Sequence, residues 1–91
     1  MYNINMLKLW AKTILGEKIT RDQIYKKEEK YDTKNFESYL NDICYEFDIP
    51  TPIILKVHIK HFENFNITRF RRSDFIEEVD YDFLIIENAL E

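Results

Sequence analysis

The sequence predicts an α+β fold: a small ββααβ domain in which a three-stranded antiparallel sheet carries two helices packed on one face. Three observations predict it. Two strand-like segments flank the only glycine, residues 32–47 carry an apolar stripe at helical spacing, and residues 81–87 are apolar on both faces of a strand. The length of 91 residues fits one domain, residues 1–91. Seven Phe, six Tyr and one Trp suffice for a core without disulfides or metals.

The first two strands are predicted to form a hairpin. In residues 6–15, an apolar face that includes Leu7 and Leu9 alternates with a face that mixes Lys with large side chains. Gly16 accepts a positive φ and is the natural turn residue. Residues 19–28 then return as a polar, Lys-rich strand. Such a composition is typical of an edge strand that avoids pairing with other sheets.

The clearest helical signal lies in residues 32–47, where Asp32 or Thr33 can cap the helix. The apolar stripe of this helix consists of Phe36, Leu40, Ile43, Cys44 and Phe47. Cys44 lies within the stripe and is expected to be a small buried hydrophobic residue. A single cysteine excludes an intrachain disulfide and fits a reducing, cytoplasmic setting.

Residues 52–65 admit two interpretations. Thr51 followed by Pro52 is a good helix start, and the apolar side chains of residues 52–65 spread over roughly 240° of a helical wheel. The strand alternative rests on the strict alternation of residues 55–60. The helix is favoured, because its cap is good and its polar sector is clean, and it is expected to be well buried.

The last quarter of the chain is predicted to contain one strand. Residues 66–73 are interpreted as a loop, followed by a short turn with Phe75 and Ile76 pointing inward. Residues 81–87 form the final strand, which pairs with the first strand and leaves the second at an edge.

The two ends of the chain are expected to contribute little to the folded domain. Residues 1–5 are expected to be loose. Residues 90–91 resemble what a cloning site before a purification tag leaves behind, so they support no inference.

Charge is strongly segregated along the sequence. The net charge is −4, but residues 1–30 carry +3, residues 31–55 carry −4, residues 56–72 carry +4 and residues 73–91 carry −7. One interpretation is compensation between neighbouring segments of the fold. The other is a bipolar surface, with a basic face that binds a polyanion or an acidic partner.

The basic segment suggests a candidate nucleic-acid interface. Its residues are Lys56, Lys60, Arg69, Arg71 and Arg72. Arginines on either side of Phe70 can bind phosphates, while the Phe70 ring can stack on a base. The competing interpretation is that these arginines pair with the acidic residues that follow, since guanidinium groups form forked salt bridges with carboxylates.

His58 and His61 are the candidate metal ligands. Two histidines three residues apart on a helix can reach one ion. Both fall within the apolar arc of the helical wheel, however, and no third ligand follows at a recognised spacing, so structural histidines are expected. The sequence contains no glycine-rich phosphate loop and no hydrolase or metalloprotease motif. These observations predict a protein with no cofactor, no metal and no enzymatic activity.

Several stretches together resemble a group of small uncharacterised proteins from low-GC Gram-positive bacteria. The stretches are residues 9–12 (LWAK), 48–52 (DIPTP), 58–70 (HxxHFxxFNxTRF) and the closing YDFLIIE segment. The resemblance spans residues 7–87 and implies a bacterial, cytoplasmic setting. That group has no assigned activity, so the resemblance identifies no functional residue.

The leading functional hypothesis is therefore a non-enzymatic interaction or regulatory module with a protein partner. Trp10, Tyr25 and Tyr31 are expected to be exposed aromatic anchors. Nucleic-acid binding is the alternative. No apolar run is long enough to cross a bilayer, so no membrane association is expected, and the oligomeric state stays open.

Overall fold

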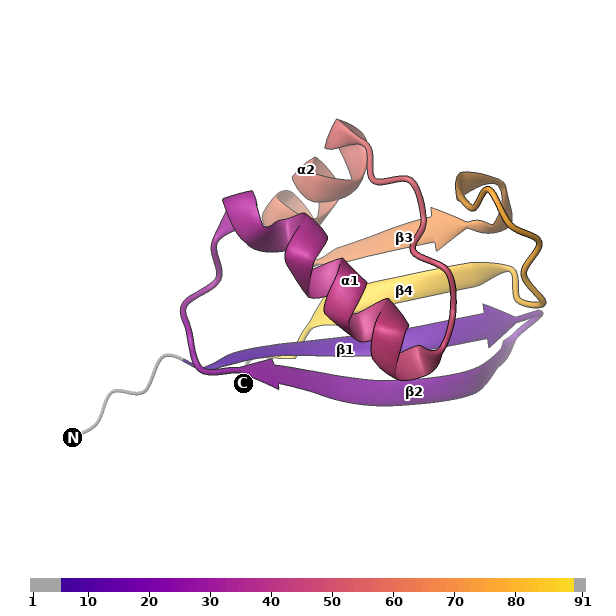
Figure 1. Cartoon of the computed structure of the whole chain (residues 1–91), viewed down its shortest axis with the longest axis horizontal. Helices are drawn as coiled ribbons and strands as arrows, with labels where there is room; N and C mark the ends of the chain where they lie inside the picture. The colour runs from indigo at the N-terminus through magenta and orange to yellow at the C-terminus, as the bar shows by residue number, and fades with distance from the viewer. Residues whose placement is uncertain (1–5, 90–91) are drawn as a thin grey trace.

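A four-stranded antiparallel sheet forms one layer of the protein, and two helices cover one of its faces (Figure 1). The computed structural model describes residues 6–89. The elements are β1 (Leu7–Leu15), β2 (Lys18–Lys27), α1 (Phe36–Phe47), α2 (Lys56–Phe65), β3 (Ile67–Arg71) and β4 (Phe83–Asn88). The strand order is β2-β1-β4-β3. The α+β class and the single helix-covered face are confirmed, and the predictions for residues 1–5 and 90–91 lie outside the described residues.

The predicted hairpin and the pairing of the last strand are confirmed. Gly16 has a φ of 65° in the turn between β1 and β2. Ala11 of β1 lies opposite Gln23 of β2 on one side and opposite Ile86 of β4 on the other. β1 is therefore a central strand, and β2 lies at an edge as expected.

The prediction of a three-stranded sheet and a loop over residues 66–73 is wrong. Residues 67–71 form β3, which pairs antiparallel with β4 and makes the order ββααββ. Thr68 and Phe70 point to the core and are 2% and 0% exposed, respectively, whereas the residues between them face outward. The sequence does not reveal this strand, because it is only five residues long and only two of its side chains point to the core.

The favoured helix over residues 52–65 is right in type but wrong in its start. α2 begins at Lys56, and Leu55 takes the N-cap position. The backbone N–H of Ile53 donates to the Asp74 carbonyl (2.8 Å), which holds residue 53 outside the helix. The N–H of Leu55 donates to His58 Nδ1 (2.9 Å). These two bonds override the helix start signalled by Thr51 and Pro52.

The core fills the space between the helices and the sheet. Every residue of the predicted α1 stripe is buried, together with Tyr39. The remaining buried apolar side chains come from the strands, from Phe62 of α2 and from the segment before β4: Leu7, Leu9, Ala11, Tyr25, Phe70, Phe75, Val79, Tyr81, Leu84 and Ile86. The inward prediction is right for Phe75 and wrong for Ile76, whose side chain is 87% exposed.

The segment between β3 and β4 is held by hydrogen bonds within itself and to the turn between β1 and β2. Arg72 forms a salt bridge with Asp82 (3.0 Å) and also donates to the Val79 carbonyl (2.7 Å). Asp82 in turn accepts a hydrogen bond from the Gly16 N–H (2.9 Å). That backbone bond and the Arg72 guanidinium lower the pKa of the Asp82 carboxyl.

We expect Cys44 to be chemically protected in the folded protein. Its side chain is 1% exposed, and burial raises the pKa of its thiol to about 11. Because the thiolate is the reactive form, alkylation by iodoacetamide at pH 8 should be at least about 100-fold slower in the native protein than in urea. Intact mass spectrometry over time measures both rates. Equal rates would show that the buried face of α1 around Cys44 becomes accessible readily in the native protein.

No helix within residues 6–89 combines the length and the apolar character that a membrane crossing needs.

Candidate functional site

A groove of about 650 Å³ lies between α2 and the edge strand β3, and we call it the β3 groove. Four exposed apolar side chains line it: Leu55 (51% exposed), Val57 (48%), Phe65 (66%) and Ile67 (37%). They are four of the ten large hydrophobic side chains that are exposed in the described part of the chain, and all four lie in this one groove. Large apolar side chains gathered in one concave place are typical of a binding site.

The backbone along the groove has a free edge. β3 pairs with β4 on one side only, because it is the last strand in the order. The hydrogen bonds from Asn88 N–H to the Asn66 carbonyl and from Arg72 N–H to the Asp82 carbonyl fix which residues face β4. By the alternation of an antiparallel ladder, the backbone groups of Ile67 and Arg69 point away from β4.

Two arginines lie on the outer side of this edge. Arg69 and Arg71 alternate with the inward Thr68 and Phe70, so their side chains lie on the sheet face opposite the helices. The Arg69 guanidinium lies over the Phe83 ring at 5.4 Å, and both arginines line the groove. The groove is therefore apolar on its helix side, whereas on its outer side the two arginines lie among Ile67 and Ile85.

A buried hydroxyl also lines the groove. The Oγ1 atom of Thr68 has no hydrogen-bond partner among residues 6–89, although its residue is only 2% exposed. A buried polar atom without a partner is costly in a native fold. Because Thr68 points to the core and this atom is enclosed, the missing partner is a local cost of the fold.

His58 has a structural position at the inner wall of the groove. Its Nδ1 accepts from the Leu55 N–H, so the proton lies on Nε2, which is 3.3 Å from Asp74 Oδ2. The imidazole ring also packs on Phe70, with 4.3 Å between ring centroids. Both nitrogens are thus engaged in holding the start of α2 and the segment after β3.

His61 lies on the same helix but is exposed, and its ring contacts Phe65 (6.0 Å between centroids). The two histidines border the same groove as the Asp74 carboxylate. No group of three or more His, Cys, Asp or Glu side chains within residues 6–89 is arranged to hold a metal ion.

The five residues of the predicted nucleic-acid interface differ in their surroundings. Arg69 and Arg71 line the groove, whereas Lys56 and Lys60 are exposed elsewhere on α2. Arg72 is paired with Asp82 of the acidic segment that follows, as the competing interpretation expected. Of the five, the groove therefore brings together Arg69 and Arg71.

The prediction of three exposed aromatic anchors is wrong for Tyr25. Its side chain is buried, because residue 25 faces the helices, and its hydroxyl donates to Asp42 (2.7 Å). Tyr31 and Trp10 are only partly exposed, and the Trp10 indole donates to Asp22 (2.9 Å). Phe65 is the exposed aromatic residue at the groove.

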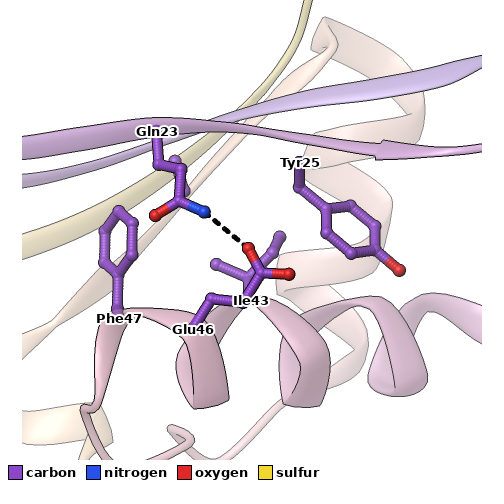
Figure 2. A pocket seen from close by; sticks show the side chains of 6 residues that line it. Gln23, Tyr25, Ile43, Glu46 and Phe47 are labelled. Atoms are coloured by element: carbon purple, nitrogen blue, oxygen red, sulfur yellow. Dashed lines mark hydrogen bonds between the residues drawn. The ribbon is translucent and has the colours of Figure 1, made fainter.

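A second hollow between β2 and α1 is closed. Figure 2 shows Gln23 of β2 and Glu46 of α1 pointing toward one another, joined by a hydrogen bond of 2.5 Å. Tyr25, Ile43 and Phe47 also line this hollow, and it leaves no room for a water molecule. We therefore place the candidate site at the β3 groove.

The comparisons with known proteins add no function to this geometry. No model of a protein family matches the sequence, and no match is found among curated proteins or among solved structures.

The wide apolar arc of residues 52–65 could have indicated the groove, but the expectation of a well-buried helix that we drew from it is wrong. The apolar arc of residues 52–65 spans roughly 240° of a helical wheel, which is wider than the stripe that one packed face of a helix needs. The fold buries only His58 and Phe62 of α2. The apolar side chains of α2 that the core does not bury include Val57 and Phe65, and both line the groove.

Proposed function

We propose that this chain is a non-enzymatic protein-interaction module whose binding surface is the β3 groove. The observation that carries the proposal is the coincidence of an apolar surface and an unpaired strand edge at one place. Each feature alone is a liability in a free protein, because apolar patches and open edges promote unspecific association. A specific partner that covers both accounts for their presence together.

The chemistry around the groove supports binding rather than catalysis. Tyr25 and Cys44, whose pKa values are raised mainly by burial, belong to the core and do not line the groove. His58 uses both ring nitrogens for hydrogen bonds within the fold. A general base needs a nitrogen within reach of a substrate proton, which His58 does not offer.

Site-specific photo-crosslinking tests the proposed function. A benzophenone amino acid at position 65, inside the groove, should form covalent adducts with a defined partner in cells of the source organism. The same amino acid at position 45 is the matched control, because Tyr45 is an aromatic residue on α1 that is 87% exposed. Val57→Glu should abolish the adduct at position 65. Adducts of equal yield at both positions would contradict the proposal.

Nucleic-acid binding is the second candidate, and the open sheet face favours it. Lys8, Lys12 and Lys26 share that face with Arg69 and Arg71, and Trp10 and Phe83 provide aromatic rings among them. Sheets that bind single strands combine aromatic rings with basic side chains. In this structure, however, Lys12 lies over the Trp10 ring at 3.7 Å and pairs with Glu87.

The salt dependence of binding tests this second candidate. Fluorescence anisotropy with a mixed-sequence single-stranded oligonucleotide should show an affinity that falls steeply with salt concentration. Lys12→Ala should weaken it, whereas Lys34→Ala, which lies outside the sheet, should not. The absence of any binding at low salt would remove this candidate.

A further inference from the structure

We propose that the β3 groove binds an extended peptide segment of a partner protein, which adds to the sheet beside β3 and alternates acidic with apolar side chains. The inference rests on the proposed function and states the chemistry of the partner. Three features of the groove define that chemistry: the direction of the free backbone groups, the sides on which charge and apolar surface lie, and the cost of pairing with a second copy.

The free backbone groups define an extended segment. The N–H and C=O groups of Ile67 and Arg69 point out of the sheet edge, whereas the Arg71 N–H is already bonded to Asp74 Oδ2 (2.8 Å). A strand that pairs with an edge satisfies such groups through its own backbone. The Asp74 bond limits the free stretch to the first part of β3, so the paired segment is short.

The two sides of the groove define the alternation. Successive side chains of a strand point to opposite faces of the sheet. Side chains of the incoming strand on the outer face would lie beside Arg69 and Arg71, where carboxylates form charge-assisted hydrogen bonds. Those on the other face would contact Leu55, Val57 and Phe65 of the α2 side. The partner segment therefore carries acidic residues at the outward positions beside Arg69 and Arg71, and apolar residues at the inward positions between them.

A second copy of the chain fits the edge poorly. Antiparallel pairing of two β3 strands centred on Arg69 would place Arg69 opposite its own copy and Arg71 opposite Ile67 of the partner strand. Like charges directly opposite one another are destabilising in a sheet. The arginines thus oppose self-association through the edge and favour a partner of opposite charge.

Selection from a random library tests the inference without assuming a partner sequence. The full chain is used to select binders from phage-displayed 12-residue peptides, and the tightest binder is synthesised. We expect alternating acidic and apolar residues in the selected peptides. Hydrogen exchange followed by NMR should show that the peptide protects the amides of Ile67 and Arg69, which point away from β4 and have no hydrogen-bond acceptor among residues 6–89.

A charge reversal with a matched control tests the role of the arginines. The double variant R69E/R71E should bind the selected peptide at least about tenfold more weakly, and should bind better a version of the peptide in which Lys replaces each acidic residue. K56E/K60E makes the same change in net charge on exposed residues outside the groove and should retain the affinity within about twofold. Circular dichroism confirms that both variants fold.

Three results would overturn the inference. Peptides that bind the groove without protecting the two amides would show side-chain docking, which leaves the proposed function intact. A dimer that Val57→Glu abolishes would identify a second copy as the occupant. A library that yields no peptide sensitive to Val57→Glu would exclude the segment itself, and the crosslinking at position 65 then decides the proposed function separately.

Discussion

Phe70→Ala is expected to lower the free energy of unfolding by about 3–5 kcal/mol. The Phe70 side chain is completely buried and packs on the His58 ring, so its removal leaves a cavity between β3 and α2. Domains of this size are stable by only about 5–15 kcal/mol, which makes this a severe loss. Urea denaturation followed by circular dichroism measures it.

The neighbouring Arg71 provides the control for Phe70. Arg71 lies on the same strand but is exposed, so Arg71→Ala should change the free energy of unfolding by no more than about 0.5 kcal/mol. If both substitutions have equally small effects, residues 67–71 are not an integral strand of the sheet. The β3 groove would then lack the strand that forms one of its sides.

His58→Leu is expected to lower the free energy of unfolding by about 1–3 kcal/mol. The substitution keeps an apolar side chain of similar size against Phe70 but removes two hydrogen bonds. It leaves the Leu55 N–H without its acceptor at the start of α2, and it removes the contact with Asp74. The same denaturation experiment measures the effect.

His61 is the matched control for this substitution. It lies on the same helix and borders the same groove, but its side chain is exposed. His61→Leu should therefore change stability by no more than about 0.5 kcal/mol. Equal losses in the two variants would contradict the capping role that the geometry assigns to His58.

Elements with a strong period could be predicted from the sequence. The α1 stripe from Phe36 to Phe47 and the alternation of β1 were predicted correctly, because burial on one face imposes a regular spacing. The pairing of β4 with β1 followed from the apolar character of both faces of β4, which requires a central strand.

Features that depend on contacts between distant segments could not be predicted in this way. The start of α2 is set by the bond from Ile53 to Asp74, 21 residues later in the sequence, and by a histidine that caps the helix with its ring. The strand β3 has only two inward residues, Thr68 and Phe70, which is too short a pattern to distinguish from a loop. The groove depends on both of these segments, so its arrangement could not be predicted from the sequence.

The central place of β1 has a consequence for how the protein is made. β1 is among the first segments of the sheet to be synthesised, yet one of its sides pairs with β4, so that Trp10 lies opposite Glu87. Closing such a long loop is entropically expensive, and proteins dominated by distant pairings fold slowly. One edge of β1 in the nascent hairpin stays unpaired until residues 83–88 emerge, and such an open edge is prone to aggregation during translation.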